Sequence, residues 1–577
     1  MVEASFSDVL RKRLAVARGD EPADLVLSGG KVFSVFTGEF LDADVAVSGE
    51  HVVGIGRYEG RETADVSGLF LIPGLIDAHM HIESTKLMVD EFARAVLPRG
   101  TTTVVLDAHE IANVFGLRGV SALLEAASSL PLDYYVMASP CVPASPFESG
   151  GAIVDAEDIA RFLAEEPRAI GIAEMMNFPG VVRGDADMVA KIEAAHRAGT
   201  HIDGHAPGVT GAELNAYLAA GPHSDHECTT YEEALEKRRL GMWIMLREGS
   251  ATKDVQALIP LVQRFGPRNC MLVTDDREPN HIVRDGHMND VLRRAVALGC
   301  SPEDAIVMGT LHPARWHRLH EHGAIAPGYL ADILALEDLE RFEPAKVWKR
   351  GRLVAENGRA SEVVRVTAPD WMRGSVHVNV VSAADLEVRA AGPVRVIKVL
   401  PSELVTRSEV ADLADTPGVV EADPGRDIAK VTVVERHKGT GRMGFGFVSG
   451  FGLRSGAIAS TIAHDAHNLV VIGVNDSDMA TAVNRSVEIG GGQVAVADGL
   501  VLAEVSCPIG GLLSDRPFEE VAAAVDAMEE AAGGLGVDLP HPFMAMSLLA
   551  LSVLPELRIT DRGLVDVDRF ELVPLEA

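Results

Sequence analysis

The chain has 577 residues, which is too long for one hydrophobic core and predicts two or three domains. Apolar residues make up 47% of the sequence and charged residues 24%, a balance typical of a soluble globular protein. The formal net charge of −32 argues against partners that are themselves anionic, so we expect no binding to nucleic acid or membranes.

Cysteine usage and the absence of long apolar runs indicate the compartment. Five cysteines are scattered along the chain and none forms a Cys-x-x-Cys pair, which favours free thiols in a reducing environment. Residues 1–20 lack the apolar segment of a signal peptide, and no run of 18 apolar residues occurs. We therefore expect a cytoplasmic protein.

The first 70 residues predict part of a small β-sandwich domain. A short amphipathic helix is expected over residues 5–18. Short β runs follow, punctuated by glycines. These runs cover residues 24–27, 31–36, 43–47 and 51–55.

Residues 71–325 show a different sequence pattern, in which predicted apolar strands alternate with helical segments. Eight strands are predicted, at 71–77, 102–107, 133–139, 169–175, 200–205, 223–227, 243–247 and 270–275. Helices between them include 155–165, 186–198 and 231–240. Eight alternating units predict an α/β fold of the (β/α)₈ barrel type.

The chain then returns to short strands and ends in a third region. Strands at 328–336 and 345–354 resemble the N-terminal β unit, so residues 326–370 are expected to complete the β-sandwich. Residues 375–577 predict an additional α+β domain with a helix over 517–532. The Gly490-Gly-Gly492 run lacks the Lys-Ser/Thr of a phosphate loop, and we interpret it as a tight turn.

Polar side chains recur where the predicted barrel strands end. His79 and His81 lie two residues apart and would share one face of a strand. Four more candidate ligands follow other strands, namely Glu174, His205, His226 and Asp275. Because barrel enzymes gather their functional groups at this end, the six residues predict a site for two divalent metal ions with Glu174 as the bridge.

The ligand types restrict the metal and suggest its use. Without cysteine ligands, Mn²⁺, Fe²⁺ or Zn²⁺ is favoured. Two such ions would hold a hydroxide near neutral pH, and Asp275 could pass its proton to a leaving group.

The motifs carry a clear resemblance. Pro73-Gly-Leu-Ile-Asp-Ala-His-Met-His81, with the later histidines and Asp275, resembles the amidohydrolase superfamily. Further stretches resemble its bacterial adenine deaminase family. They are His79-Met-His-Ile-Glu-Ser84, Asp107-Ala-His-Glu-Ile-Ala-Asn113, Asp203-Gly-His-Ala-Pro207, Asp285-Gly-His-Met288, Gly450-Phe-Gly-Leu453, Ala463-His-Asp-Ala-His-Asn468 and Leu554-Pro-Glu-Leu-Arg-Ile-Thr-Asp561.

This resemblance implies hydrolytic deamination of adenine to hypoxanthine and ammonia, a step of purine salvage. A metal-held hydroxide would attack C6 of the purine, with Asp275 shuttling protons. Glu83 would lie near the purine, and His109 and Glu110 would orient substrate or move protons. Asp276 would contact substrate or hold a ligand imidazole. The resemblance also suggests a homo-oligomer, with a dimer expected.

Two alternatives stay open at this point. A cyclic amide hydrolase of the dihydroorotase or hydantoinase type would keep the metal site, but many such relatives use a carboxylated lysine where this chain has Glu174. A non-catalytic structural protein of amidohydrolase type would have lost ligands, whereas all six positions are filled. His464 and His467, three residues apart, either reach the barrel mouth, bind a further ion or form a buried pair.

Overall fold

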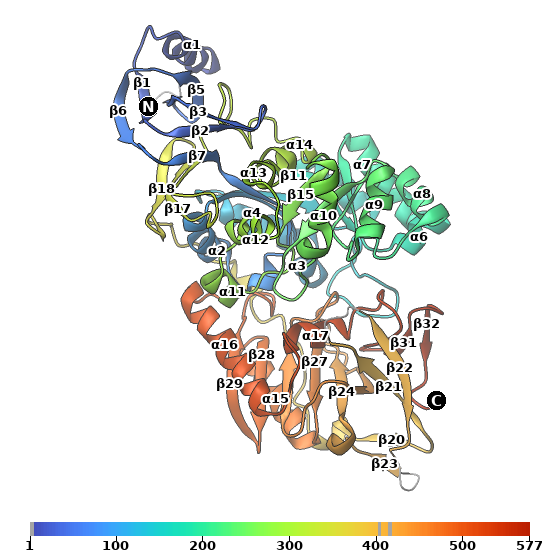
Figure 1. Ribbon diagram of the computed structural model, residues 1–577. Coiled ribbons are helices and arrows are strands. Elements are labelled where there is room, and N and C mark those ends of the chain that lie inside the picture. Colours follow the sequence, from blue (N-terminus) through green and yellow to red (C-terminus); the bar gives the residue numbers. More distant parts are fainter. Residues whose placement is uncertain (1–4, 402–404, 414–417) are drawn as a thin grey trace.

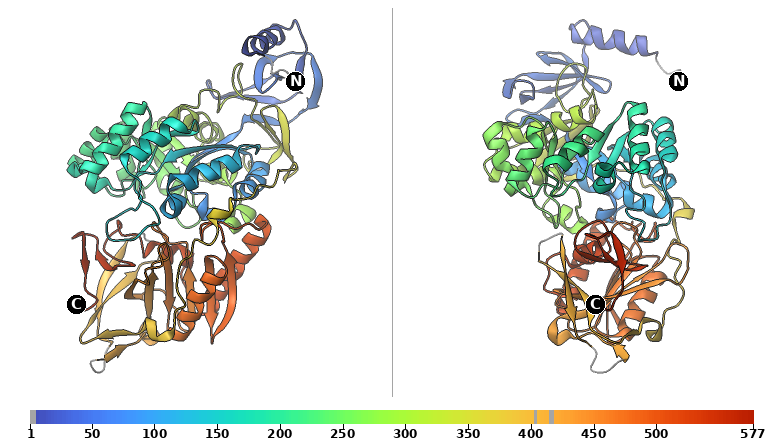
Figure 2. Two further views of the ribbon diagram at one scale, coloured as in Figure 1. Left: turned by 180° about the vertical axis from the view of Figure 1, so that it is seen from behind. Right: turned by 90° about the vertical axis from the view of Figure 1, so that its right-hand side faces the viewer.

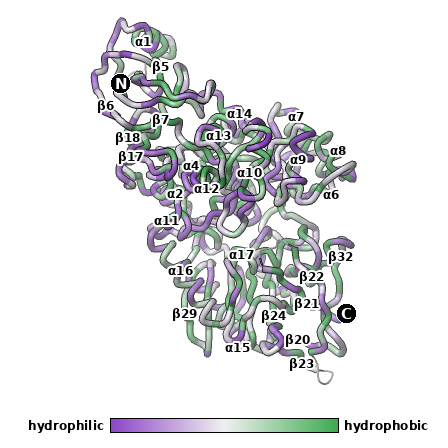
Figure 3. Tube along the Cα trace, viewed as in Figure 1, coloured by the Kyte–Doolittle hydropathy of each residue, from purple (hydrophilic) through white to green (hydrophobic). Residues whose placement is uncertain are grey.

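The computed structural model describes residues 5–401, 405–413 and 418–577, and these form three domains in a row (Figure 1). The N-terminal β domain and the C-terminal domain lie at opposite ends of the barrel, as Figure 2 also shows. None of the described helices is both long and apolar enough to cross a membrane, and hydrophilic residues interrupt the hydrophobic ones along the helices (Figure 3).

The small β domain is built from both flanks of the barrel, as predicted. Helix α1 (Phe6–Ala17) begins at Ser5, whose side chain accepts a hydrogen bond from the backbone NH of Asp8. Within residues 5–65 a four-stranded sheet has the order β5-β4-β1-β6, with bounds β1 (Ala23–Ser28), β4 (Asp44–Ser48), β5 (His51–Gly56) and β6 (Gly60–Asp65). Its core joins Leu27 and Val47 to Ile333 and Trp348 from the returning segment.

A second sheet in this domain mixes the two flanks within residues 31–360. Its strand order is β19-β18-β17-β16-β7-β2-β3. The N-terminal strands are β2 (Lys31–Ser34), β3 (Glu39–Asp42) and β7 (Phe70–Pro73). The returning strands are β16 (Ile333–Leu336), β17 (Pro344–Lys349), β18 (Arg352–Glu356) and β19 (Arg359–Ala360).

Between residues 75 and 273, all of them described, eight strands form the barrel. They are β8 (Leu75–Met80), β9 (Thr101–Asp107), β10 (Asp133–Ala138), β11 (Ala169–Met175), β12 (His201–Gly204), β13 (Ser224–Asp225), β14 (Trp243–Arg247) and β15 (Cys270–Val273). Strands β8 to β12 pair in parallel order, as do β13 to β15. A parallel bridge between Met80 and Asp275 closes the barrel beside the predicted metal ligands.

The first and sixth strands differ from their predicted bounds. The segment predicted as one strand over 71–77 is divided at Gly74 between β7 of the small domain and β8 of the barrel. A Cβ at Gly74 would lie 2.2 Å from Oγ1 of Thr102, so only glycine allows the chain to pass there. Strand β13 pairs with β14 over two residues only, and on the side of β12 the Ser224 hydroxyl accepts a hydrogen bond from the NH of Gly204 at 3.2 Å.

Helices follow the barrel strands and cover the outside of the barrel. They are α2 (Val89–Val96), α3 (His109–Phe115), α4 (Leu117–Ala127), α5 (Ala156–Glu165), α6 (Phe178–Arg183), α7 (Ala186–Ala198), α8 (Gly211–Ala220), α9 (Tyr231–Arg239), α10 (Val255–Phe265), α11 (Pro279–Arg284), α12 (Met288–Ala297), α13 (Pro302–Met308) and α14 (Leu311–Trp316). Asp155, Asp185 and Thr230 cap the three predicted helices, which explains why their starts were readable from sequence.

The C-terminal domain has an α+β fold centred on one large sheet. Its described strands have the order β22-β21-β25-β24-β27-β26-β28-β29. Their bounds are β21 (Val394–Val399), β22 (Thr406–Ala411), β24 (Ile428–Val434), β25 (Met443–Ser449), β26 (Ala457–Ser460), β27 (Leu469–Gly473), β28 (Gly492–Ala497) and β29 (Leu500–Ser506). Helices α15 (Asp476–Glu488) and α16 (Phe518–Gly534) pack on this sheet.

Smaller elements complete the domain. Strands β20 (Val388–Ala390) and β23 (Gly418–Val420) pair with each other, and β30 (Leu557–Thr560), β31 (Gly563–Asp566) and β32 (Glu571–Val573) form a meander. Gly490, Gly491 and Gly492 all have positive φ and turn the chain from α15 into β28, as predicted. Helix α17 (Pro542–Leu548) lies next to the barrel (Figure 1).

Candidate metal centre and active site

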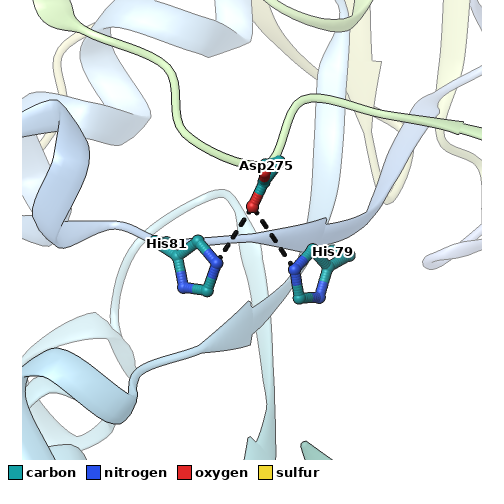
Figure 4. Close-up of side chains that lie close together, drawn as sticks. All are labelled: His79, His81 and Asp275. Carbon is teal, nitrogen blue, oxygen red and sulfur yellow. Dashed lines mark ion pairs between the residues drawn. The ribbon is translucent and has the colours of Figure 1, made fainter. Parts of the chain in front are cut away.

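The end of β8 presents two histidines to Asp275, which follows β15. Nε2 of His79 lies 3.5 Å from Oδ1 of Asp275, and Nε2 of His81 lies 3.0 Å from the same oxygen (Figure 4). Nδ1 of His81 is 2.9 Å from the carbonyl oxygen of Asp107. If Nδ1 donates its proton there, Nε2 of His81 keeps a free lone pair for a metal ion.

Glu174, at the end of β11, joins the remaining histidines to this group. Its Oε2 lies 2.6 Å from Nδ1 of His205 and 3.1 Å from Nε2 of His226. Its Oε1 lies 3.8 Å from Nε2 of His81. The two oxygens of one carboxylate therefore face different histidines, which is the position that a bridging ligand requires.

The six predicted ligands meet in one buried cluster and fit divalent cations. Ligand atoms bound to one ion at about 2.1 Å lie about 3–3.5 Å apart, close to the separations seen here. Among the described residues, Nε2 of His79 and Nδ1 of His226 have no hydrogen-bond partner although both are buried. Nitrogen and oxygen donors of this kind suit Mn²⁺, Fe²⁺ or Zn²⁺.

Electrostatics keep the two carboxylates of the cluster ionised. Burial opposes the charged form of Glu174, but His205 and His226 hold its pKa well below the ordinary value. Burial likewise opposes ionisation of Asp275, whose pKa is held low by His79, His81 and Arg247. Burial, followed by the charge of His226, lowers the pKa of His79. Burial opposes the charged form of His81, His205 and His226, but the neighbouring carboxylates raise the pKa of all three, so a cation that binds here would displace protons from these imidazoles.

Arg247 and Glu227 belong to the site but were not predicted. Arg247 ends β14, and its NH1 donates to Oδ2 of Asp275 at 2.9 Å and to Oε1 of Glu227 at 2.5 Å. The same Glu227 oxygen lies 3.3 Å from Nε2 of His226. Both residues lie at or just after a barrel strand end, so the strand-end rule that identified the ligands would also have identified them.

His109 and Asp107 lie beside the cluster. Asp107 accepts a hydrogen bond from the backbone NH of Glu174 at 3.0 Å and lies 3.2 Å from Nδ1 of His109. That nitrogen is also 3.4 Å from Oε1 of Glu174, whereas Nε2 of His109 is 3.5 Å from Asp465 of the C-terminal domain. His109 thus lies between the predicted bridge and the C-terminal domain.

The other predicted residues lie beside the cluster at different depths. Asp276 faces the cavity, and its Oδ1 accepts a hydrogen bond from the Ser84 hydroxyl. Glu83 and Glu110 are fully buried and do not line the cavity. Oε1 of Glu83 accepts from the backbone NH of Ile111 at 2.9 Å, and burial, followed by the charge of Glu110, raises its pKa.

The cavity over the cluster has a polar half and an apolar half. The barrel contributes mainly polar residues, whereas Met176 and a set of C-terminal side chains form the apolar wall. The lining residues are His81, His109, Glu174, Met176, His205, His226, Glu227, Arg247, Ala251, Thr252, Asp275, Asp276, His464, Asp465, Met544, Leu548, Leu551 and Leu554. A substrate that fills this cavity must contact both domains.

A (β/α)₈ barrel with histidines and carboxylates at its strand ends is typical of metal-dependent amidohydrolases, and residues 70–354 match the sequence model of the Amidohydrolase family. Residues 403–571 match the model described as Adenine deaminase C-terminal domain. The adenine deaminase of Cereibacter sphaeroides is 47% identical, over 99% of this chain and 100% of its own length. That of Desulfatibacillum aliphaticivorans is 45% identical, over 97% of this chain and 99% of its own length. The chain belongs to the adenine deaminase family.

Solved structures also match the chain. A β-aspartyl dipeptidase from Fervidobacterium islandicum AW-1 aligns with a TM-score of 0.46 and 20% identity, over 59% of this chain and 99% of that one. An adenosine deaminase from Xanthomonas campestris with bound Zn aligns with a TM-score of 0.45 and 14% identity, over 59% of this chain and 95% of that one.

Proposed function

We propose that this protein hydrolytically deaminates adenine to hypoxanthine and ammonia. The observation that carries the proposal is the pairing of two features in one site. A buried cluster of six candidate metal ligands lies at the barrel mouth, and the cavity over it is lined by residues of the domain shared with adenine deaminases.

The ligands of two divalent ions would be His79, His81, Glu174, His205, His226 and Asp275. Mn²⁺ or Fe²⁺ is favoured, with Zn²⁺ as the alternative. Bound there, such ions would supply Lewis-acid activation of the attacking water. Glu174 would serve both positions, since its Oε1 faces His81 and its Oε2 faces His205 and His226.

Asp275 is the proposed proton carrier. Arg247 holds Oδ2 of Asp275 at 2.9 Å, which fixes the carboxylate while Oδ1 faces the histidines of β8. Asp275 also lines the cavity, so it would accept the proton of the attacking water. That proton would then pass to the amino group, which leaves C6 as ammonia, while the purine keeps the oxygen of the water on C6 and its second hydrogen on a ring nitrogen.

The roles proposed for the remaining predicted residues depend on whether each residue lines the cavity or is buried behind it. Asp276 and His109 line the cavity and would contact the purine directly. Glu110 would act through His464, because Nδ1 of His464 lies 3.6 Å from Oε1 of Glu110 and the imidazole faces the cavity. Glu83, bonded to the backbone of α3, would fix the position of Glu110.

The cyclic amide hydrolase alternative is not favoured. Among the described residues that line the cavity there is no lysine to be carboxylated. The buried Lys191 instead donates to the carbonyl oxygen of Pro140 at 2.8 Å. A homodimer and a cytoplasmic location remain predictions.

The direct test is to mix the Mn²⁺-loaded protein with adenine and to follow purine absorbance and ammonia together. We expect one ammonia for each adenine consumed. Dihydroorotate and a hydantoin serve as parallel substrates. Opening of either ring without ammonia release from adenine would overturn the proposal.

A further inference from the structure

The C-terminal domain reaches the cavity with two segments that are far apart in sequence. The first is the loop of residues 463–468 between β26 and β27, which contributes His464 and Asp465. The second is α17 with the residues after it, which contribute Met544, Leu548, Leu551 and Leu554. The backbone NH of His464 donates to the Ser547 hydroxyl at 2.8 Å, so the two segments are fixed to each other.

His464 retains hydrogen-bonding capacity in a buried position. Its exposed fraction is 6%, and its ring lies among three carboxylates. Nδ1 is 3.5 Å from Asp465 and 3.6 Å from Glu110, and Nε2 is 4.0 Å from Asp276. These separations are longer than ordinary hydrogen bonds, which lie at about 2.7–3.2 Å. A buried imidazole surrounded in this way is available to donate to a molecule in the cavity.

The neighbouring His467 does not share this role. Its Nδ1 accepts a hydrogen bond from the backbone NH of Ala463 at 3.0 Å, so the neutral ring carries its proton on Nε2. A protonated Nε2 is not a metal ligand, which argues against a further ion held by His464, His467 and Glu110. Of the two histidines, only His464 lines the cavity.

The apolar wall has the character of a surface for an aromatic ring. Three leucines and a methionine from residues 544–554 line the same cavity as the polar metal cluster. Burying the face of a planar base against such side chains is favourable, whereas its ring nitrogens need polar partners at the edge. His464 lies beside this wall and can serve that edge.

We propose that the C-terminal domain supplies the base-binding half of the active site. In this arrangement His464 donates a hydrogen bond to a ring nitrogen of the substrate, and the leucines of α17 and the following turn pack against the ring face. The inference rests on the proposed function, because it takes an aminopurine as the substrate. It gives the C-terminal domain a role in substrate recognition alongside Asp276 and His109 of the barrel.

The test compares two substitutions in the full-length, metal-loaded protein, His464→Gln and Leu548→Ala. Leu548 is only half-buried, so its truncation is compatible with folding. Matched controls are His377→Gln and Leu500→Ala, which alter exposed side chains elsewhere in the C-terminal region. Each protein is measured for kcat and KM with adenine, for hypoxanthine binding by calorimetry, and for metal content.

We expect the two site variants to raise KM and the hypoxanthine Kd by about tenfold, the effect of losing one hydrogen bond or one buried contact. Metal content should stay at the wild-type level and the controls should match wild type. Unchanged hypoxanthine binding in both site variants, or loss of metal in His464→Gln, would overturn the inference.

The two proposals fail in different ways. If the wild-type protein releases no ammonia from adenine, the proposed function is wrong, whatever the variants do. If the wild-type protein deaminates adenine and both site variants bind hypoxanthine as tightly as it does, only the base-binding role is wrong. Circular dichroism of each variant separates a folding defect from a binding defect, and Leu548→Met provides a conservative substitute if the alanine variant unfolds.

Discussion

Arg247 is the buried cation that the carboxylates beside the metal centre share. Its guanidinium contacts Glu227, Asp254 and Asp275, and its exposed fraction is 2%. Burial opposes its charge, but Glu227 and Asp275 raise its pKa well above the ordinary value. The side chain therefore compensates negative charge that would otherwise be buried unpaired.

Replacing Arg247 with methionine should damage both stability and activity. We expect the free energy of unfolding to fall by about 3–5 kcal/mol, as when one member of a buried ion pair is removed. The ratio kcat/KM should fall by about 100-fold or more, because Asp275 loses the donor that fixes it. Urea unfolding and steady-state kinetics measure the two effects. Arg247→Lys keeps the charge and should lose less, and a methionine variant as stable as wild type would contradict this account.

Glu174 is the residue on which metal occupancy should depend most. Glu174→Gln removes the charge that faces His205 and His226, so we expect this variant to retain less than half the metal of the wild-type protein. Since ligands that bind only the folded state stabilise it by about 2.7 kcal/mol at 100 times Kd, chelation should lower the Tm of wild type. The Tm of Glu174→Gln should hardly change on chelation. His223→Gln, an exposed control near His226, should behave as wild type. Full metal content in Glu174→Gln would count against the bridge.

A chain of two histidines links three barrel elements. Nε2 of His201, at the start of β12, lies 3.0 Å from Nδ1 of His317, just after α14. Nε2 of His317 lies 2.8 Å from the carbonyl oxygen of Ala78 in β8. Both hydrogen bonds can form when the two imidazole rings are neutral. Burial, followed by the charge of Arg318, lowers the pKa of His201 to about 3.

This linkage predicts an acid-sensitive contribution to stability. Because the pKa of His201 is about 3 in the fold and about 6.5 when unfolded, its contribution is complete above pH 6.5 and is lost as the pH falls towards 3. At pH 5 the loss amounts to about 2 kcal/mol. In His201→Gln, the difference in unfolding free energy between pH 7 and pH 5 should shrink by that amount. The exposed control His377→Gln should leave it unchanged, and an equal pH dependence in His201→Gln would refute the linkage.

Elements with strong local signals were predictable from the sequence. The bounds of strands such as β11 and β14 agree with the predicted bounds because these strands are short apolar runs. The helices capped by Asp155 and Asp185 begin where expected. The division at Gly74 was not predictable, because its cause is a contact with Thr102 on the next strand.

Some residues of the candidate site were likewise predictable from the sequence, and others were not. The strand-end histidines could be read from the sequence because each follows an apolar strand. Arg247 also ends an apolar strand, so the same rule points to it, but its contacts with Glu227 and Asp275 were not predictable because these residues are distant from it in sequence. The place of His464 in the cavity depends on the docking of two domains, which no local pattern encodes.

The barrel and the C-terminal domain share one continuous hydrophobic core. Ile111 of α3 and Ile509 and Leu512 of the C-terminal domain belong to the same buried cluster. Polar contacts add to it, since Asn280 donates to Asp526 at 2.8 Å and the backbone NH of Ser149 donates to Asp561 at 2.9 Å. We infer that the two domains unfold as one cooperative unit, so that the cavity between them is set by their packing.

Gly510 tests this coupling, because it lies in the shared core beside the helix that carries His109 and Glu110. A Cβ at Gly510 would lie 2.9 Å from Cδ1 of Ile111, and its φ of +67° disfavours any side chain. Gly499 has a similar φ of +73°, but no described atom lies within 4 Å of its Cβ position. Gly510→Ala therefore adds a clash between domains to the backbone strain, whereas Gly499→Ala adds strain alone.

We expect Gly499→Ala to lower the free energy of unfolding by about 1–2 kcal/mol without changing kcat/KM. Gly510→Ala should cost a further 1–3 kcal/mol, roughly the cost of overpacking a core, and should reduce kcat/KM because α3 is displaced. Differential scanning calorimetry should still give a single transition for both variants. If Gly510→Ala instead separates the trace into two transitions, the domains are independent units. Equal kcat/KM in the two variants would mean that packing at this interface does not set the geometry of the site.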